Sequence, residues 1–370
     1  MMSNIQHESS THKAEVVDVV LEKHPNADSL SVAKVFGYTV CVRTADWDGV
    51  KTGVYITPDS SVDVSRPEFS FLADQAKSDG KARIKAKKLR GIVSFGLLIK
   101  APDDAVLGQD LAAQLGVEHY EPPSEQDRRG LFLGGEVASP PKVYFCKYDV
   151  DAFRRYHRLF VDGEPVFVTE KIDGCNARYV WHDGAMHCGS RTEWKKEFPN
   201  YDHVTVESLT PKIGEERAKE VVDKLHSKPK PKNLWWSVLE QTPSLEKFCR
   251  DHPGIVVYGE CYGHVQKLRY GHGPGKVSFS AFDLLDGTTW LDAKAARDVG
   301  LDLPWVPTLA DGLPYSFDAI VAMAEGQSTV PGAQHIREGC VVKPLIERQD
   351  AHIGRVCFKA VGGEYLEKFR

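Results

Sequence analysis

The chain has 370 residues, of which 42% are hydrophobic and 27% charged. This is enough apolar material for two domains with hydrophobic cores, and it excludes a wholly disordered protein. The formal net charge is −5, so overall charge does not favour a nucleic-acid partner, and such a partner has to be argued from the position of basic residues.

The eight cysteines are scattered and contain no C-x-x-C pair, which argues against a zinc ribbon or a thioredoxin-type motif. The polar first 13 residues lack the apolar core of a signal peptide, and a chain of this length does not need disulfides. We therefore expect reduced thiols, a cytoplasmic protein and a flexible tail over residues 1–13. No apolar run reaches about 18 residues, so no membrane span is predicted.

The first region, residues 14–117, is predicted to form a small β-barrel. Its hydrophobic residues alternate as in half-buried strands, and turn-forming residues separate the runs. A short helix that ends at Gly116 closes the region. Several short strands within about a hundred residues favour an OB-type barrel. The expected strands and the helix are residues 14–21, 38–46, 91–99 and 110–116.

A basic run in this region is the candidate nucleic-acid contact. It contains Arg83, Lys85, Lys87, Lys88 and Arg90. On a single strand, Arg83, Lys85 and Lys87 would share one face and could follow a line of phosphates. The alternative is a solvated edge strand whose charges prevent aggregation.

Residues 118–130 are polar, include Pro122 and Pro123, and show no periodicity, so they are predicted to be a linker. The second region, residues 131–370, mixes strands and helices. The lysine–proline run Ser227–Asn233 is expected to be an exposed loop, with phosphate contact as the alternative. The expected strands are residues 165–172, 177–182, 254–263, 276–285, 339–345 and 355–361, and the expected helices are 215–227, 244–252 and 317–326.

Charged residues interrupt nearly every strand of this second region, close to glycines. Buried or half-buried charges are costly unless they are paired or functional. A lysine is a nucleophile only when it loses its proton, through desolvation or neighbouring cations. Carboxylates are hard oxygen ligands for Mg²⁺, which would neutralise a leaving pyrophosphate. The interrupting residues are Glu170, Lys171, Asp173, Glu260, Asp283, Glu338, Lys343 and Lys359.

The order of these residues resembles that of the covalent nucleotidyltransferases, which comprise RNA ligases, DNA ligases and mRNA capping enzymes. The stretch "EKIDG" (170–174) is similar to their K-x-D-G motif. Four further motif-like stretches follow in the family's order: "YGECYG" (258–263), "SFSAFDLL" (278–285), "EGCVVKP" (338–344) and "CFKAV" (357–361). A lone K-x-D-G is common by chance, whereas five motifs in order are specific. Asn176 and Arg191 stand at spacings that favour RNA ligases.

The resemblance implies a role for each matching residue. Lys171 would be the adenylylated nucleophile, with Glu170 against the adenine, Glu260 on the ribose and Phe282 stacked on the base. Asp173 and Glu338, together with Glu260, would hold the catalytic Mg²⁺ or Mn²⁺ directly or through its waters. Lys343 and Lys359 would contact phosphates, and Asn176 and Arg191 would help to hold the 5′-phosphate and the nucleotide phosphate.

One motif departs from the family pattern. RNA ligases similar to that of phage T4 carry K-x-K in the last motif. Here Lys359 is kept and either Val361 occupies the second lysine position or Cys357 occupies the first. One phosphate contact is therefore absent or supplied from elsewhere.

The domain order narrows the resemblance further. DNA ligases and capping enzymes place an OB domain after the last motif, whereas here the OB candidate comes first and about eleven residues follow Lys359. This order resembles the RNA ligases of the Naegleria and Deinococcus type.

The sequence therefore predicts an α+β protein with an N-terminal OB-type barrel and a mixed, mainly antiparallel nucleotidyltransferase domain. The implied activity is ATP-dependent RNA ligation with Mg²⁺ or Mn²⁺. The implied partner is RNA with 5′-phosphate and 3′-hydroxyl ends, a nicked duplex being one form, and we expect a monomer. Two alternatives stay open: a GTP-dependent capping guanylyltransferase, and a catalytically silent RNA- or tRNA-binding protein.

Overall fold

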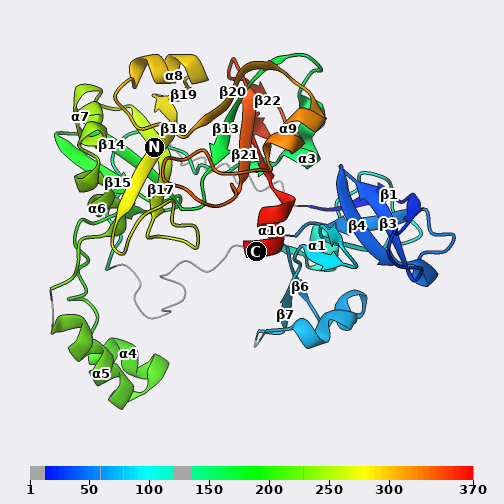
Figure 1. Cartoon of the computed structure of the whole chain (residues 1–370). Coiled ribbons are helices and arrows are strands. Elements are labelled where there is room, and N and C mark those ends of the chain that lie inside the picture. Colours follow the sequence, from blue (N-terminus) through cyan, green and yellow to red (C-terminus); the bar gives the residue numbers. More distant parts are fainter. Residues whose placement is uncertain (1–12, 59, 78, 121–134, 228, 370) are drawn as a thin grey trace.

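The computed structural model describes residues 13–369 except 59, 78, 121–134 and 228. A small β-rich domain, drawn in blue in Figure 1, lies beside a larger domain that runs from green to red. The predicted tail lies outside the described residues except for Lys13, and so does most of the predicted linker. Glu118–His119 of that linker forms strand β11, which pairs with β6 of the small domain.

The N-terminal domain consists of short, mostly antiparallel strands around two apolar clusters. The central strand β5 pairs with β1 and β10, and β3 pairs with β2 and β4. Helix α1 (Ala112–Leu115) ends at Gly116, whose φ of +64° is the left-handed conformation that glycine adopts readily. The remaining bounds are β1 Ala14–Asp18, β2 Leu21–Lys23, β3 Leu30–Val35, β4 Tyr38–Arg43, β5 Thr52–Ile56, β6 Ser60–Asp63, β7 Lys81–Arg83, β8 Lys87–Leu89, β9 Ile92–Ser94 and β10 Leu97–Lys100.

Three runs that were expected to be single strands are each broken into two. Residues 14–21 contribute to β1 and β2, and residues 91–99 to β9 and β10, with Gly96 at a φ of +85° between them. The basic run is divided as well, because β7 pairs with β6 whereas β8 pairs with β9. The prediction that Arg83, Lys85 and Lys87 share one face of one strand is therefore wrong.

The C-terminal domain is built on two sheets. One has five strands in the order β12-β24-β21-β13-β20, and the other has six in the order β16-β15-β14-β17-β18-β19. Their pairs are antiparallel except for the parallel pair β12 and β24. The bounds are β12 Asp151–Ala152, β13 Pro165–Lys171, β14 Cys175–His182, β15 Ala185–Gly189, β16 Trp194–Lys195, β17 Val256–Gly263, β18 Val277–Asp286, β19 Thr289–Trp290, β20 Thr308–Pro314, β21 Gly339–Pro344, β22 Gln349–Asp350, β23 Gly354–Arg355 and β24 Phe358–Val361.

Helices cover the outer face of each sheet. Buried residues of α6, α7 and α8 form one core with the six-stranded sheet, and those of α3 and α9 form another with the five-stranded sheet. The mixed α+β architecture predicted from the sequence is confirmed. The bounds are α3 Phe153–Tyr156, α6 Leu234–Gln241, α7 Pro243–Asp251, α8 Ala293–Val299, α9 Phe317–Met323 and the terminal α10 Gly363–Phe369.

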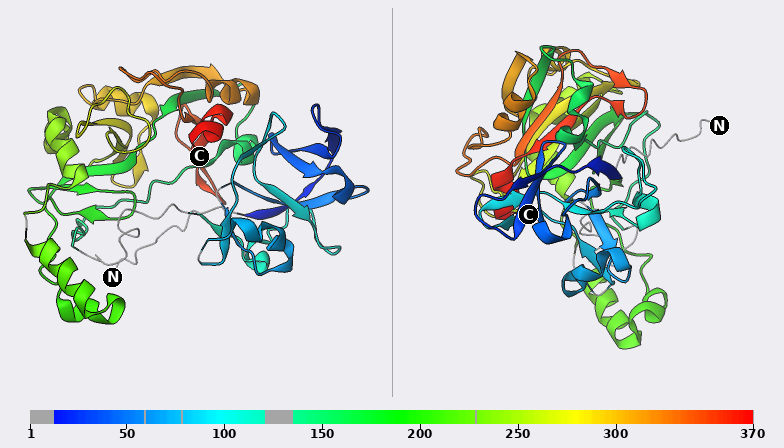
Figure 2. Two further views of the ribbon diagram at one scale, coloured as in Figure 1. Left: turned by 60° about the horizontal axis from the view of Figure 1, so that its bottom comes forward. Right: turned by 90° about the vertical axis from the view of Figure 1, so that its right-hand side faces the viewer.

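A helical hairpin, α4 (Val206–Ile213) and α5 (Glu215–His226), projects from the six-stranded sheet. Its helices pack on each other through Leu209 and Ala218, a small core separate from those of the sheets. Figures 1 and 2 show this hairpin and the β6–β7 part of the N-terminal domain extending toward the same side of the molecule.

Polar contacts join the two domains next to β24. Arg155 of α3 pairs with Glu15 at 2.9 Å, and its neighbour Arg154 donates to the carbonyl of Gly37 at 2.7 Å. In the described part of the chain no helix is long and apolar enough to cross a membrane. All eight cysteines are free thiols, as predicted.

Candidate active site

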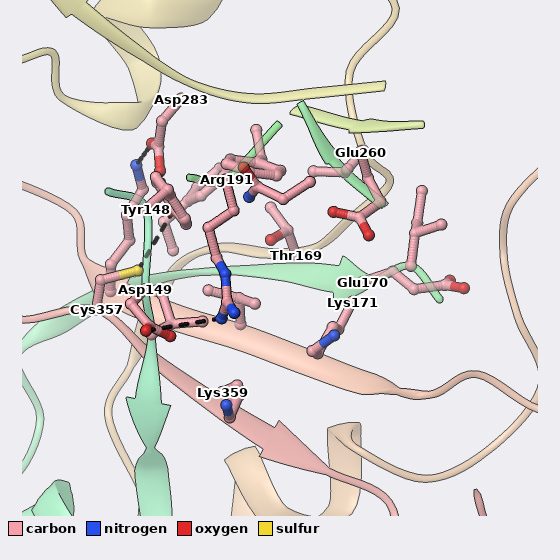
Figure 3. Close-up of a pocket in the computed structure, with 18 residues that line it drawn as sticks. Tyr148, Asp149, Thr169, Glu170, Lys171, Arg191, Glu260, Asp283, Cys357 and Lys359 are labelled. Carbon is pink, nitrogen blue, oxygen red and sulfur yellow. Dashed lines mark hydrogen bonds and ion pairs between the residues drawn. The ribbon is translucent and has the colours of Figure 1, made fainter. Parts of the chain in front are cut away.

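The five motif-like stretches converge on one pocket between the two sheets of the C-terminal domain (Figure 3). The pocket has a volume of about 190 Å³. Both sheets supply its walls: β13, β21 and β24 come from one, and β14, β17 and β18 from the other. Of the residues predicted to form the site, it is lined by Glu170, Lys171, Asn176, Arg191, Glu260, Phe282, Lys343 and Lys359.

Lys171 is the last residue of β13 and lies opposite Gly339 of β21. A side chain at Gly339 would place its Cβ 2.1 Å from the carbonyl oxygen of Ala360, so this glycine permits the close approach of β24. The Lys171 Nζ is 2.8 Å from Oε2 of Glu338. The lysine side chain is 23% exposed whereas that of Glu338 is 3% exposed. The ion pair therefore fixes the lysine at the pocket while leaving its amine accessible.

Glu260 of β17 is the carboxylate most perturbed by this environment. Burial is the main cause that raises its pKa to about 8; the carboxylates of Glu338 and Asp173 add to the shift, and Lys171 opposes it. Three carboxylates lie around the amine of Lys171, and Glu260 can release its proton only at a cost unless further positive charge is nearby. A divalent cation would supply that charge.

Asp173 does not line the pocket but is buried beside it, and its backbone explains its position. The N–H of Asp173 donates to the hydroxyl of Tyr270 at 2.6 Å. Tyr270 is buried and has a φ of +51°, unusual for a non-glycine residue. The side chain of Tyr270 thus anchors the loop that follows the lysine, a role that no motif in the sequence indicates.

Glu170 lines the pocket, and its carboxylate is held by a neighbouring loop. It is buried and accepts hydrogen bonds from the hydroxyl of Ser328 at 2.5 Å and from the N–H and hydroxyl of Thr329, both at 2.7 Å. Figure 3 shows it turned away from the charged end of Lys171. These three hydrogen bonds anchor the carboxylate, and the adenine contact expected of Glu170 stays a prediction.

The expected base-stacking residue, Phe282, lines the pocket with an aromatic neighbour. The ring of Tyr148 lies 4.4 Å from that of Phe282, centroid to centroid, and its hydroxyl donates to Asp283. Tyr148 was not predicted as a site residue, because the stretch before β12 carries no motif. The two rings form an aromatic wall suited to a flat base.

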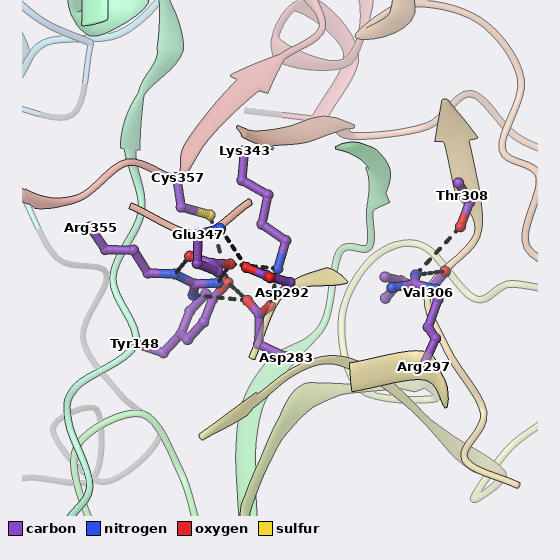
Figure 4. Close-up of polar contacts among 10 residues, drawn as sticks. All are labelled: Tyr148, Asp283, Asp292, Arg297, Val306, Thr308, Lys343, Glu347, Arg355 and Cys357. Carbon is purple, nitrogen blue, oxygen red and sulfur yellow. Dashed lines mark hydrogen bonds and ion pairs between the residues drawn. The ribbon is translucent and has the colours of Figure 1, made fainter. Parts of the chain in front are cut away.

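Lys343 reaches the pocket wall but its ammonium is neutralised (Figure 4). It pairs with Asp283 and, at 2.9 Å, with Glu347. Arg355 completes the network through Asp283 at 2.9 Å and Glu347 at 2.5 Å. The cations Arg355 and Lys343 hold the pKa of Asp283 well below its usual range against the opposing effect of burial. The expected phosphate contact of Lys343 would have to compete with this buried network.

The last motif presents Cys357 and Lys359 to the pocket, but not Val361. The pocket-facing register is therefore the one in which Cys357 stands where the family pattern has a lysine. Burial raises the pKa of the Cys357 thiol to about 11, so the thiol is uncharged at neutral pH. Lys359 has no ion-pair partner within the described ranges, and its amine is the cation available to a phosphate.

Arg191 and Asn176 complete the pocket. Arg191 pairs with Asp149 at 3.7 Å, and Figure 3 shows the charged ends of Arg191, Lys171 and Lys359 directed into the same space. The side-chain oxygen of Asn176 is buried and has no hydrogen-bond partner among the residues that the structure describes. An unsatisfied acceptor at a pocket wall is a ready contact for a ligand donor.

The acidic side chains at this site are suitable ligands for the expected divalent cation, although they are not arranged as a complete coordination shell. In the described part of the chain, no group of three or more histidine, cysteine or acidic side chains is arranged to hold a metal. Mg²⁺ usually keeps several waters and takes few protein ligands. Glu260, Glu338 and Asp173 are the residues that would hold such an ion or its waters.

The basic run of the N-terminal domain does not form one free cationic track. Arg83 stacks on the ring of Tyr120 at 4.1 Å, and Lys87 donates to Gln75 at 2.5 Å. Lys88 pairs with Glu367 of α10 at 2.6 Å, which connects this run to the C-terminal domain. Lys85 and Arg90 are exposed, as a nucleic-acid contact would require, and that role of the run stays a prediction.

Comparison with solved structures shows the same fold over nearly the whole chain. The structure is similar to Naegleria gruberi RNA ligase in a lysine-to-alanine mutant with ATP and Mn, with a TM-score of 0.71 and 20% identity over 96% of this chain and 98% of that one. A glutamate-to-alanine mutant of the same Naegleria gruberi RNA ligase with AMP and Mn gives a TM-score of 0.72 at 21% identity. The Naegleria gruberi RNA ligase with PPi gives a TM-score of 0.71 at 21% identity. Both comparisons cover 96% of this chain and 98% of the other.

Family models identify both domains. A model of an OB-fold domain matches residues 14–101, which confirms the predicted barrel type. No curated protein matches the chain in a sequence search. A model of RNA ligases matches residues 164–361, more than half of the chain and all five motif-like stretches. The chain therefore belongs to the RNA ligase family, a family of ATP-dependent polynucleotide ligases, and carries an OB-fold domain before its ligase domain.

Proposed function

We propose that this protein joins RNA ends with 3′-hydroxyl and 5′-phosphate groups through a covalent Lys171–AMP intermediate, as an enzyme of RNA repair. The observation that carries the proposal is the position of Lys171. Its amine is accessible in a pocket that also holds an aromatic wall, two unburied cations and an unsatisfied amide oxygen. The Naegleria RNA ligase structures with ATP and Mn support the choice of nucleotide and metal.

In the first step, the unprotonated Lys171 amine attacks the α-phosphorus of ATP. A P–N bond forms, the P–O bond to the leaving pyrophosphate breaks, and the attacking nitrogen loses one proton to solvent. Lys359 and Arg191 stabilise the charge that grows on the phosphates. A bound Mg²⁺ or Mn²⁺ would neutralise the leaving pyrophosphate and disfavour the ammonium form of the lysine.

In the second and third steps, AMP passes to the RNA and is then released. A 5′-phosphate oxygen attacks the phosphorus of the lysyl-AMP, so that a 5′–5′ pyrophosphate linkage forms and Lys171 leaves as the amine. A 3′-hydroxyl then attacks the 5′-phosphorus and expels AMP. We propose that Arg191 and the amide NH₂ of Asn176 donate to the 5′-phosphate, because a partly exposed guanidinium and this amide lie at the same pocket, while the unsatisfied Asn176 oxygen is left to accept from a ligand hydroxyl.

The proposed step with ATP is tested by incubating the protein with Mg²⁺ and ATP labelled at its α-phosphate, in parallel with α-labelled GTP. We expect a labelled protein with ATP, no label in Lys171→Ala, and label in an exposed-lysine control, Lys294→Ala. Label with GTP alone would replace the proposal by capping-type guanylyl transfer. Sealing is then tested with a nicked RNA duplex and with single-stranded RNA, each with a 5′-phosphate.

A further inference from the structure

The lysine–proline run Ser227–Asn233 takes no part in the pocket around Lys171, yet it is fixed to a second segment of the ligase domain. The N–H of Asn233 donates to the carbonyl of Glu197 at 2.8 Å, and Lys232 pairs with the carboxylate of Glu197 at 2.9 Å. The ring of His226 lies 3.1 Å from the carbonyl of Tyr201. The end of the run, at Lys232 and Asn233, and His226 of α5 therefore contact the segment from Glu197 to Tyr201.

A cavity of about 390 Å³ opens where these two segments meet. Phe198 at its rim is 53% exposed, one of the more exposed large apolar side chains of the chain. An isolated exposed aromatic residue needs no explanation. This one, however, borders a hollow that a second ring and a lysine also line. The lining residues are Phe198, Pro199, Asn200, Tyr201, Asp202, Leu225, His226 and Lys230.

Each of the two rings has a lysine beside it. The Nζ of Lys230 is 5.9 Å from the ring centroid of Tyr201, and that of Lys232 is 5.7 Å from the ring of Phe198. Two aromatic faces interleaved with two cations are the combination that binds a single strand of nucleic acid, because bases stack on the rings while ammonium groups contact phosphates.

We propose that Phe198, Tyr201, Lys230 and Lys232 form an RNA-binding surface that holds a strand beside the break to be sealed. This aromatic–lysine surface adds a substrate contact to the proposed ligase function, on which it rests. In this proposal the lysine–proline run contacts phosphates, which the sequence left open as the alternative to a simple exposed loop.

The surface is within reach of RNA held at the pocket. Phe198 follows Arg191 by seven residues, so the two Cα atoms are at most about 25 Å apart, at about 3.6 Å per residue. This distance corresponds to about seven nucleotide steps of 3.4 Å along one strand of a duplex. The connecting segment is held in place, because Trp236 donates to the carbonyl of Lys195 at 2.8 Å.

The existing contacts of the two lysines do not prevent phosphate binding. Lys232 pairs with Glu197 and, at 3.4 Å, with Glu240, whose side chain is exposed. Lys230 donates to the carbonyl of Lys224 at 3.4 Å, a long hydrogen bond. Exposed ion pairs contribute little to stability, so a phosphate can replace them at small cost.

The test compares a Phe198→Ala/Lys230→Glu double variant with a matched control, Leu301→Ala/Lys294→Glu. The control removes another exposed apolar side chain and reverses an exposed lysine elsewhere on the domain. Binding is measured by fluorescence anisotropy at several salt concentrations. The probe is a nicked RNA duplex that continues as a single strand within about seven nucleotides of the break and lacks the 3′-hydroxyl at the break, so that its unpaired bases can stack and it cannot be sealed. Lysine adenylylation with ATP alone is measured in parallel.

We expect the double variant to bind the nicked RNA at least about tenfold more weakly, as loss of one base stack and one phosphate contact implies. The slope of log affinity against log salt should become shallower by about one. Adenylylation and the control variant should match the wild type. Binding by the double variant within twofold of the control would overturn the proposal. Adenylylation is read without RNA, so its absence in the wild type would contradict the ligase function separately and leave this comparison valid.

Discussion

Lys171, the last residue of β13, and Glu338, the residue before the adjacent strand β21, form an ion pair with an Nζ–Oε2 distance of 2.8 Å. The side chain of Glu338 is almost fully buried, and a buried carboxylate is costly unless it is paired. The pair aims the lysine into the pocket but also favours its protonated form. Attack on a nucleotide therefore requires another positive charge to pair with the Glu338 carboxylate in place of Lys171. A divalent cation near Glu260 and Glu338 would supply that charge.

Glu338→Gln should reduce the transfer of AMP to Lys171 by about 100-fold or more, the usual scale for loss of one key electrostatic contact in an active site. The amide can neither pair with the ammonium group nor stabilise a divalent cation. The measurement is single-turnover adenylylation at saturating ATP. Glu246→Gln on the surface of α7 serves as the control, and equal rates in the two variants would contradict the role given to Glu338.

Thr329→Val should lower stability without changing the choice of nucleotide. It removes one hydroxyl donor from the buried Glu170 carboxylate, and hydrogen bonds to charged groups contribute about 1.5–3 kcal/mol. The measurements are chemical unfolding and the ratio of ATP to GTP labelling, with the exposed Thr289→Val as control. A changed nucleotide ratio at unchanged stability would indicate that Glu170 contacts the adenine.

Substitution of Lys343 should mainly lower stability, whereas substitution of Lys359 should mainly slow adenylylation. Lys343→Met leaves two buried carboxylates short of one cation and should cost about 3–5 kcal/mol of folding free energy. Lys359→Ala should change stability by no more than about 0.5 kcal/mol and still slow adenylylation by about 100-fold. Unfolding curves and adenylylation rates of both variants decide this. A stable but inactive Lys343→Met would instead indicate direct phosphate contact.

Without divalent cations, the protein should lose stability as the pH rises from about 5 to about 8. The pKa of Glu260 is raised to about 8 in the folded state, so over this range the folded protein holds a proton that the unfolded chain has released. Stability falls with rising pH wherever the folded state binds more protons. Thermal unfolding in EDTA should therefore show a weaker fall for Glu260→Gln than for the wild type. If the stability of the wild type and of Glu260→Gln changed equally with pH, Glu260 would be ionised over this whole pH range.

The sequence predicted which segments meet at the pocket, because each motif has its own spacing and lies on its own strand. The pocket brings together Lys171, Glu260, Phe282 and Lys359, which are separated by as many as 188 residues. The residues that were missed act from segments whose spacing carries no signal. Tyr148 lines the pocket itself, and the others support the site from behind: Tyr270, Ser328, Thr329 and Arg355.

The N-terminal domain shows why its details were harder to predict. The alternation in residues 81–90 suits one strand, but β7 and β8 pair with different neighbours, so long-range pairing overrode the local pattern. The contact between Lys88 and Glu367 joins residues 279 positions apart, and no property of the basic run alone indicates it.

The most direct test of the ligase assignment is transfer of α-labelled AMP to the protein, followed by a chase of the labelled protein with a 5′-phosphorylated nicked RNA. We predict label on wild-type protein with ATP and Mg²⁺, none on Lys171→Ala, and loss of the label from protein as sealed RNA appears. A labelled Lys171→Ala protein, or a folded wild-type protein that takes up no label with either Mg²⁺ or Mn²⁺, would contradict the account.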